Sequence, residues 1–285
     1  MSRIAYVNGR YVPHRGAAVH VEDRGFQFAD GVYEVFAVAG GKLIDEELHL
    51  RRLARSLAEL RIEKPFSEPV LRHKMRELLR RNRIANGVLY LQITRGAAPR
   101  EHAFPKGVKP SVVMTARPAR PPDPSFGERG VAIVTIPDIR WRRCDIKSVS
   151  LLPNVLGKQH AKEAGAYEAW QVAEDGHVTE GTSTNAWIVT RDGTLVTRPA
   201  DHAILNGVTR ITVLALARKE GLAIEERGFT VAEALAAAEA FLTSTTSYVT
   251  PVVRIDGNPV ANGAPGRFTK KLLSRYRSYV AAPEA

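Results

Sequence analysis

The sequence predicts an α/β protein built from two domains. Its 285 residues are enough to bury one large core or two of medium size. Short β-prone segments alternate with longer segments of helical periodicity, which is typical of mixed α/β proteins. Residues 117–127 carry four prolines and no apolar period. This composition favours an interdomain linker at 117–127, between a smaller N-terminal domain over 1–116 and a larger C-terminal domain over 128–285.

Local signals place the elements of the first domain in order. Asn8-Gly9 supplies the two positive-φ positions of a type I′ turn, so a β-hairpin is expected over 4–12. The helix expected over 46–61 has a buried stripe at the 3.6-residue period, formed by Leu50, Leu53, Leu57 and Leu60. Ser67 is expected to cap the next helix. The other expected segments are a glycine-punctuated loop over 21–31, strands over 32–38, 43–44, 87–95 and 110–116, and that second helix over 67–82.

Aspartate-glycine turns mark the hairpins of the second domain. Asp175-Gly176, Asp192-Gly193 and Asp256-Gly257 each separate two β-prone segments. The remaining expected elements are strands over 130–136, 167–173, 177–180, 185–190 and 194–197, and helices over 154–165, 207–220, 231–239 and 266–280.

The chain carries a formal net charge of +11. Such a charge fits either a polyanionic partner such as nucleic acid or an arginine-rich, solvated surface. The arginines are dispersed, and much of the excess lies on two expected helices, so we expect a solvated surface and no nucleic-acid partner. A positive field would still attract small anions such as phosphate cofactors and carboxylate substrates.

Several absences in the sequence narrow the class of protein. No run of about 18 apolar residues occurs, so no membrane span is expected. The N-terminal residues lack the apolar region of a signal peptide. The single cysteine, Cys144, excludes an intrachain disulfide framework and fits a reducing cytoplasm. With no cysteine pair and scattered histidines, no metal site is expected.

One lysine and one glutamate have the chemistry that a pyridoxal-phosphate site requires. Lys147 is the one lysine in the stretch 144–154, and Glu180 follows 33 residues later. A buried lysine can attack an aldehyde to form a Schiff base, and a buried carboxylate can keep a pyridine nitrogen protonated. Taken alone, Lys147 is equally consistent with a solvated surface lysine, and Glu180 with a turn carboxylate.

The longer sequence context resembles the fold-type IV pyridoxal-phosphate transaminases, and most closely the D-amino-acid transaminases. The match includes Arg140-Trp141-x-x-Cys144-Asp145-Ile146-Lys147-Ser148, then Leu151-Leu152, then Lys158-Gln159, and later the segment 179–185. The resemblance implies that Lys147 forms the Schiff base and that Glu180 pairs with the pyridine nitrogen. It also implies that Ser183 lies near the cofactor. Pro153-Asn154, Thr182 and Thr184 depart slightly from the family's usual residues.

The phosphate group of the cofactor needs backbone N–H groups and hydroxyls. Gly207-Val208-Thr209 at an expected helix start supplies them, although by itself it is an ordinary helix start. The family carries the same Gly-x-Thr-Arg signature together with a Thr-Ser-Thr-Thr-Ser loop, here Thr243 to Ser247. The resemblance therefore implies phosphate contacts from Ser244 and Thr245. It assigns Arg52, in the His-x-x-Arg-Leu frame, as the phosphate arginine, for which a solvated helix arginine is the alternative.

Substrate choice is expected to depend on Arg100 and His102, which lie two residues apart after the strand 87–95. In the D-amino-acid transaminases this Arg-x-His pair, with a tyrosine that matches Tyr33, holds the substrate α-carboxylate. The alternative is an exposed loop unrelated to binding. Leu205, just before the phosphate turn, matches a pocket position beside the cofactor.

The resemblance thus implies a transaminase that moves the amino group of D-amino acids to a 2-oxo acid such as 2-oxoglutarate. The reaction would be ping-pong, through the Schiff base of Lys147 with pyridoxal 5′-phosphate. A homodimer is implied, because the loop of Arg100 reaches the neighbouring subunit in the family. Three other activities of the same fold remain as alternatives: branched-chain L-amino-acid transaminase, R-amine transaminase and aminodeoxychorismate lyase.

Overall fold

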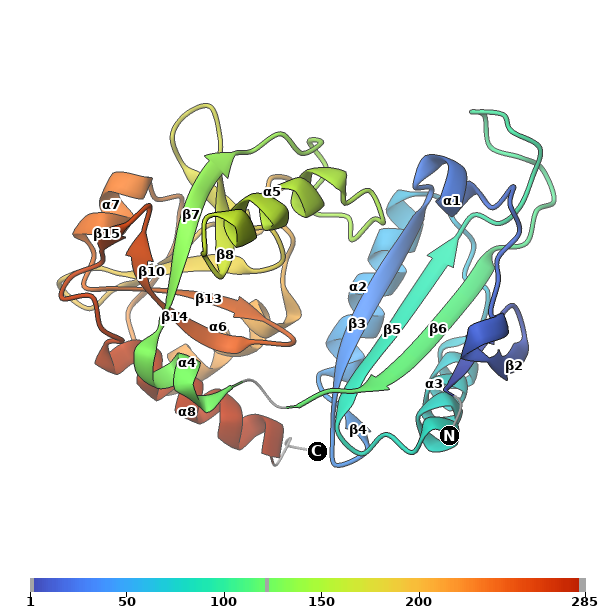
Figure 1. Cartoon of the computed structure of the whole chain (residues 1–285), viewed down its shortest axis with the longest axis horizontal. Coiled ribbons are helices and arrows are strands. Elements are labelled where there is room, and N and C mark those ends of the chain that lie inside the picture. The colour runs from blue at the N-terminus through green and yellow to red at the C-terminus, as the bar shows by residue number, and fades with distance from the viewer. Residues whose placement is uncertain (1–2, 121–122, 282–285) are drawn as a thin grey trace. The chain divides into compact units, whose positions relative to one another are not determined.

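The computed structural model describes residues 3–120 and 123–281, and its packing divides the chain into two units (Figure 1). Unit 1 comprises Met1–Pro121 and Ile146–Ser150, and unit 2 comprises Pro122–Asp145 and Leu151–Ala285. Each unit combines a sheet with helices, so the α/β class expected from the sequence is confirmed. In the two described stretches, no helix is long and apolar enough to cross a membrane.

Unit 1 is organised around an antiparallel six-stranded sheet with the order β2-β1-β6-β5-β3-β4. The expected N-terminal hairpin is confirmed, because Asn8 and Gly9 have φ angles of 44° and 94° in the turn between β1 and β2. The strands are β1 (Ile4–Val7), β2 (Arg10–Pro13), β3 (Gly31–Ala39), β4 (Lys42–Leu43), β5 (Gly87–Thr94) and β6 (Ser111–Pro118).

Two helices, α2 (Glu46–Glu59) and α3 (Glu68–Asn82), pack on this sheet (Figure 1). The apolar stripe expected on α2 forms part of the core, which includes Leu50, Leu53, Leu57, Met75, Leu78, Leu89, Leu91 and Met114. Ser67 stands at the N-cap of α3, but its side chain makes no capping hydrogen bond. A short 3₁₀ helix, His14–Gly16, precedes the segment expected as a loop over 21–31.

The segment expected as a loop over 21–31 contains a helix, α1 (Arg24–Phe28). Asp23 caps it by accepting a hydrogen bond from the Gly25 N–H at 2.9 Å. The helix is only five residues long, too short to show an apolar period in the sequence. Figure 1 shows α1 at the end of the sheet where β3 begins.

Residues 146–150 pair with the N-terminal part of β3 through main-chain hydrogen bonds. The Lys147 carbonyl accepts a hydrogen bond from the Tyr33 N–H at 3.0 Å, and the Val149 N–H donates to the Gly31 carbonyl at 3.0 Å. Ile146 is 4 % exposed and joins the core of unit 1. The domain boundaries expected from the sequence did not include this return of the chain to unit 1. The burial of Ile146 in the core of unit 1 explains the return. Because side chains alternate along a strand, Lys147 emerges on the face opposite to Ile146.

Unit 2 contains a mixed nine-stranded sheet with the order β12-β11-β10-β13-β14-β7-β8-β9, and β15 pairs with β14. The pairs β7–β8, β7–β14 and β11–β12 are parallel. Its strands are β7 (Val131–Pro137), β8 (Glu168–Val172), β9 (Val178–Gly181), β10 (Asn185–Val189), β11 (Leu195–Thr197), β12 (Ile224–Glu226), β13 (Glu239–Ser244), β14 (Tyr248–Ile255) and β15 (Asn258–Pro259).

The helices of unit 2 are α4 (Pro124–Arg129), α5 (Leu152–Glu163), α6 (Val208–Lys219), α7 (Val231–Ala236) and α8 (Arg267–Ala281) (Figure 1). Part of the expected linker 117–127 is regular structure, since β6 reaches Pro118 and α4 begins at Pro124. Asp123 caps α4, and proline is well tolerated at a first helical position. Residues 121–122 of the expected linker lie outside the described residues.

Candidate active site

Lys147 and Tyr33 lie side by side in unit 1. The Lys147 Nζ is 4.3 Å from the centroid of the Tyr33 ring, which stacks in turn on Tyr90 at 5.7 Å. The Lys147 N–H donates to the Ser56 hydroxyl of α2 at 3.2 Å, so the main chain at the lysine is fixed on both sides. Burial raises the pKa of Tyr90 to about 12, with a smaller contribution from Tyr33, and keeps the Tyr90 phenol neutral. An amine above an aromatic face gains a cation–π interaction when it is protonated.

Arg52 is held by a buried carboxylate that the sequence analysis did not single out. Its Nε and Nη2 donate to the two oxygens of Glu34, each at 2.8 Å, and His49 Nδ1 lies 2.7 Å from Glu34 Oε2. Glu34 is fully buried. Burial alone raises the pKa of Glu34, but Arg52 and then His49 outweigh it and lower the pKa to about 2. The available sequence signal was a charged residue within the apolar strand 32–38.

Glu180, near the end of β9, accepts several hydrogen bonds within unit 2. It accepts hydrogen bonds from the Asn185 amide at 3.0 Å, from the Leu205 N–H at 3.2 Å and from the Arg140 guanidinium. Arg140 also donates to Asp138 at 2.7 Å. Burial disfavours a charged Arg140, but Asp138 and Glu180 together raise its pKa above the ordinary value. Glu180 is therefore a buried carboxylate with a permanent cation beside it.

Arg140 was present in the matched motif, yet its role had no sequence signal of its own. The structure shows that this role is to fix Glu180.

Leu205 lies beside this carboxylate, whereas Ser183 is bound to a different one, Glu168. Leu205 contributes main-chain groups, because its carbonyl also accepts from the Asn185 amide at 2.9 Å. Ser183 follows β9, and its hydroxyl donates to Glu168 at 2.9 Å. Glu168 is fully buried and also accepts from the Thr182 hydroxyl. Glu168 was not predicted as a site residue; its one sequence signal is a charge within an apolar strand, as for Glu34.

The start of α6 and the loop after β13 lie at one end of the sheet of unit 2. Asn185 is paired with Thr243 across β10 and β13, and a Cβ on Gly207 would meet the Asn185 Oδ1 at 2.0 Å. Only glycine fits at position 207. The N-terminus of α6 therefore packs against Asn185, the same residue that donates a hydrogen bond to Glu180.

Hydroxyls and helix-start N–H groups therefore gather at this end of the sheet. No side chain caps α6. Thr209 Oγ1 is 3.5 Å from the Tyr276 hydroxyl, and Ser244 Oγ is 2.7 Å from Ser247 Oγ. Thr245 is half-buried, whereas Thr243 accepts from the Trp187 indole and belongs to the core. The donors suit a phosphate, and the nearby anionic Glu180 suits a protonated pyridine nitrogen.

Arg100 and His102 converge on one aromatic ring of unit 1. The Arg100 guanidinium is 5.0 Å from the centroid of Phe28, and the His102 ring is 5.3 Å from it. Both side chains are exposed. The spacing of two residues thus brings both groups to the same side of the loop, as expected for a pair that shares one carboxylate.

Comparison with known proteins identifies relatives of the whole chain. Residues 31–255 match the model of the amino-transferase class IV family. The D-alanine aminotransferase of Bacillus licheniformis is 44% identical over 278 residues, which cover 98% of this chain and 97% of that protein. The branched-chain amino acid aminotransferase of Escherichia coli has the same fold, with a TM-score of 0.91 and 22% identity over 100% of this chain and 97% of that one.

The 4-amino-4-deoxychorismate lyase of Pseudomonas aeruginosa is also similar. Its TM-score is 0.84 with 26% identity, over 97% of this chain and 99% of that chain.

The buried Glu34 generates a prediction about acid stability. The pKa of Glu34 is depressed from 4.5 to about 2, so its ionisation stabilises the fold above about pH 4.5, and this contribution is lost as the pH falls toward 2. The contribution is on the order of 3 kcal/mol. Urea unfolding of Glu34→Gln should show lower stability than the wild type at pH 7 and a smaller loss between pH 4.5 and 2.

Glu77→Gln is the matched control for this experiment. Hydrogen bonds from Arg80 and Arg81 also lower the pKa of Glu77 to about 2, but this carboxylate belongs to a surface network on α3. Because salt screens surface pairs, 1 M NaCl should remove the effect of Glu77→Gln and leave that of Glu34→Gln. Equal salt sensitivity of the two variants would contradict the buried pair.

Proposed function

The chain belongs to the amino-transferase class IV family, and we propose that it transfers the amino group of D-amino acids, of the D-alanine type, to a 2-oxo acid such as 2-oxoglutarate. It is a pyridoxal 5′-phosphate-dependent aminotransferase, and its substrates are small amino acids and 2-oxo acids. The observation that carries the D-amino-acid assignment is the 44% identity to a D-alanine aminotransferase over nearly the full length of both chains.

The residues of unit 2 fit the cofactor group by group. The N–H groups of Val208 and Thr209 and the hydroxyls of Thr209, Ser244 and Thr245 would hold the phosphate. Glu180 would bind the pyridine nitrogen, and Ser183 and Leu205 would lie beside the ring. From unit 1, Arg52 would add a cation to the phosphate. When bound, the cofactor supplies an electron sink for the electrons released at the substrate Cα.

Lys147 is the proposed catalytic group. Its Nζ would hold the aldehyde carbon of the cofactor in the resting enzyme and would give up this place to the substrate amine. Its Nζ then takes the proton from the substrate Cα and later returns it, acting as general base and general acid. The Tyr33 ring, whose centroid lies 4.3 Å from Nζ, limits where the amine can move. The two substrates therefore react in turn, which gives ping-pong kinetics.

Arg100, His102 and Tyr33 are proposed to bind the substrate α-carboxylate. An arginine binds a carboxylate through two directed hydrogen bonds, so it fixes orientation as well as position. With the carboxylate fixed and Lys147 on one side of Cα, only one enantiomer presents its Cα–H bond to the lysine. This argument supports the selection of one enantiomer. The choice of the D-enantiomer is supported by the 44% identity to a D-alanine aminotransferase, against 22% to the branched-chain aminotransferase of Escherichia coli.

We propose that the active form is a homodimer in which the loop of Arg100 serves the site of the neighbouring subunit. The exposure of Arg100 and His102 in unit 1 supports this assignment. The single cysteine, Cys144, supports work in the reducing cytoplasm.

The enantiomer preference is the direct test of the proposed function. We expect transamination of D-alanine with 2-oxoglutarate, and at least 100-fold lower kcat/KM with L-alanine, since a reversed Cα–H bond points away from Lys147. Arg100→Ala should raise KM for D-alanine by about 10- to 100-fold and narrow the ratio between enantiomers. If the wild-type protein transaminates L-leucine faster than every D-amino acid tested, a branched-chain transaminase is the better assignment.

Glu180 should control the rate and not the retention of the cofactor. A neutral amide stabilises a protonated pyridine less than a carboxylate does, so Glu180→Gln should lower kcat by about 100-fold, which is on the order of 3 kcal/mol. The absorbance of the bound cofactor should persist. Glu174→Gln is the matched control, because Glu174 is exposed on the turn between β8 and β9. Similar kcat values for both variants would exclude the pairing of Glu180 with the ring.

Hybrid dimers test whether the loop of Arg100 crosses to the neighbouring subunit. Differently tagged Lys147→Ala and Arg100→Ala subunits are co-expressed, and the hybrid is purified through both tags. Measured at D-alanine concentrations well below KM, the hybrid should recover about half of the wild-type activity, because one of its two sites has both residues. A hybrid with about half the activity of the Arg100→Ala homodimer would show that each loop serves its own subunit.

A further inference from the structure

A buried arginine, Arg24, fastens the loop of Arg100 and His102 to the body of unit 1. Its Nη1 donates to the Glu101 carbonyl and its Nη2 donates to the His102 carbonyl at 3.2 Å. Only 4 % of the Arg24 side chain is exposed. Arg24 therefore binds the two main-chain groups that immediately follow Arg100, although it lies 77 and 78 residues before them in the sequence.

Asp30 fixes the orientation of Arg24. Arg24 Nε donates to Asp30 Oδ2 at 2.8 Å, and Arg95 binds the same carboxylate with two bonds of 2.7 and 2.9 Å. Burial alone raises the pKa of Asp30, but the hydrogen bonds from Arg95 and Arg24 lower it below the ordinary value. Three donors of Arg24, namely Nε, Nη1 and Nη2, are bonded to acceptors in fixed positions, so the guanidinium has a single orientation.

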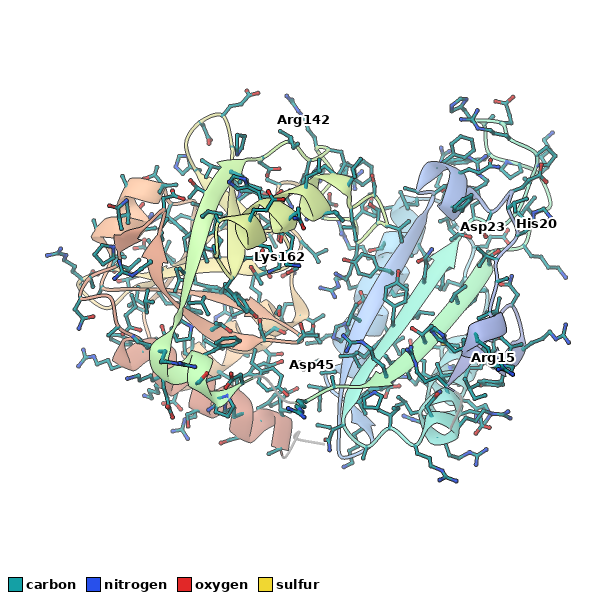
Figure 2. The ribbon with its side chains drawn as sticks, viewed as in Figure 1. Arg15, His20, Asp23, Asp45, Arg142 and Lys162 are labelled. Atoms are coloured by element: carbon teal, nitrogen blue, oxygen red, sulfur yellow. The ribbon has the colours of Figure 1, made fainter. Side chains whose placement is uncertain are left out.

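The helix that carries Arg24 is itself anchored to the strand before the loop. Asp23, shown at the start of α1 in Figure 2, accepts the Thr94 hydroxyl of β5 at 2.9 Å. The Arg24 N–H donates to the Gly96 carbonyl at 2.9 Å. A Cβ on Gly25 would meet the Thr94 side chain at 2.3 Å, so α1 packs directly on β5.

Phe28, at the other end of α1, is a platform for the side chains of the loop. Arg24 lies 4.9 Å from its ring centroid, Arg100 lies 5.0 Å from it, and the His102 ring lies 5.3 Å from it. A cation over an aromatic face is attracted by the ring quadrupole, so Phe28 favours the orientation of Arg100 as well as its place. One five-residue helix thus holds both the main chain and the side chains of the pair.

We propose that Arg24 and Phe28 are positioning residues that set the geometry of the carboxylate-binding pair Arg100 and His102, and through it the affinity and chirality of substrate binding. This inference rests on the proposed function of that pair. From the sequence, residues 21–31 are expected to form a connecting loop, and no role for these two residues follows from that expectation. Neither residue is proposed to touch the substrate.

Arg24→Lys tests the main-chain part of the proposal. A lysine keeps the charge beside Asp30, which stays paired with Arg95, but its single ammonium group lacks the planar fork that reaches two carbonyls and a carboxylate together. We expect KM for D-alanine to rise on the order of tenfold, because small misplacements of binding groups weaken productive binding strongly. The kcat and the absorbance of the bound cofactor should remain within about twofold of the wild type.

Phe28→Leu tests the platform and remains informative if Arg24→Lys does not fold. It should also raise KM for D-alanine and narrow the ratio of kcat/KM between D-alanine and L-alanine. Phe26→Leu is the matched control, since it makes the same change on the same helix at a ring that is 75 % exposed. This control should leave KM for D-alanine within about twofold of the wild type.

A double-mutant cycle distinguishes positioning from a general structural role. If Arg24 and Phe28 act through Arg100 and His102, Arg24→Lys and Phe28→Leu should raise KM by less than about twofold when Arg100 and His102 are already both alanine. Equal increases of KM in both backgrounds would overturn the proposal. So would an unchanged KM in Arg24→Lys and Phe28→Leu while Arg100→Ala raises it, an outcome that leaves the proposed function intact.

The remaining outcome concerns the proposed function itself. If Arg100→Ala leaves both KM and the enantiomer ratio unchanged, the carboxylate-binding role of the pair is wrong, and the positioning role falls with it.

Discussion

A buried carboxylate stays ionised only where a cation and hydrogen bonds replace the water it has lost, and the candidate site depends on this constraint. Glu34 is paired with Arg52, Asp30 with Arg24 and Arg95, and Glu180 with Arg140. Such pairs add little net stability compared with apolar residues, because the desolvation cost is high. These pairs instead fix the orientation of the side chains, because a planar guanidinium can donate to only a few arrangements of acceptor atoms. In each pair, one member is a predicted site residue or is bonded to the segment that carries one.

A second constraint is the free edge of β3. An edge strand exposes unpaired N–H and C=O groups, and residues 146–150 satisfy those of Gly31 and Tyr33. This pairing explains the alternating burial of the residues around the lysine. Ile146 and Ser148 are buried, and Lys147 between them is half-buried. The main chain of Lys147 is therefore as fixed as that of a strand residue, and its side chain extends to the ring of Tyr33.

The sequence was sufficient for the elements whose signal is local. Asn8-Gly9 predicted a turn, and the leucine period predicted α2, because short-range sterics and one-sided burial determine both. The fold class and the family followed from a long motif. The sequence was insufficient for Glu34, Arg140 and Glu168, which act only through partners that are distant in the chain or brought close by strand pairing. It also missed α1, whose five residues are stabilised by Asp23, Thr94 and the loop, and hardly by their own helix propensity.

The arginine-rich composition follows from the same physics. Part of the excess lies on α3, where Arg72, Arg80 and Arg81 form surface pairs with glutamates of α2 and α3. Another part is buried, where lysine would be a poor substitute, because Arg24, Arg52 and Arg140 each bind two or more acceptors at once. A chain that orients its site residues with buried guanidinium groups uses arginine for structure and leaves lysine available for a chemical role. The one lysine of the stretch 144–154 is the proposed Schiff-base residue, a role that arginine could not fill, since only an amine that can lose its proton can attack an aldehyde.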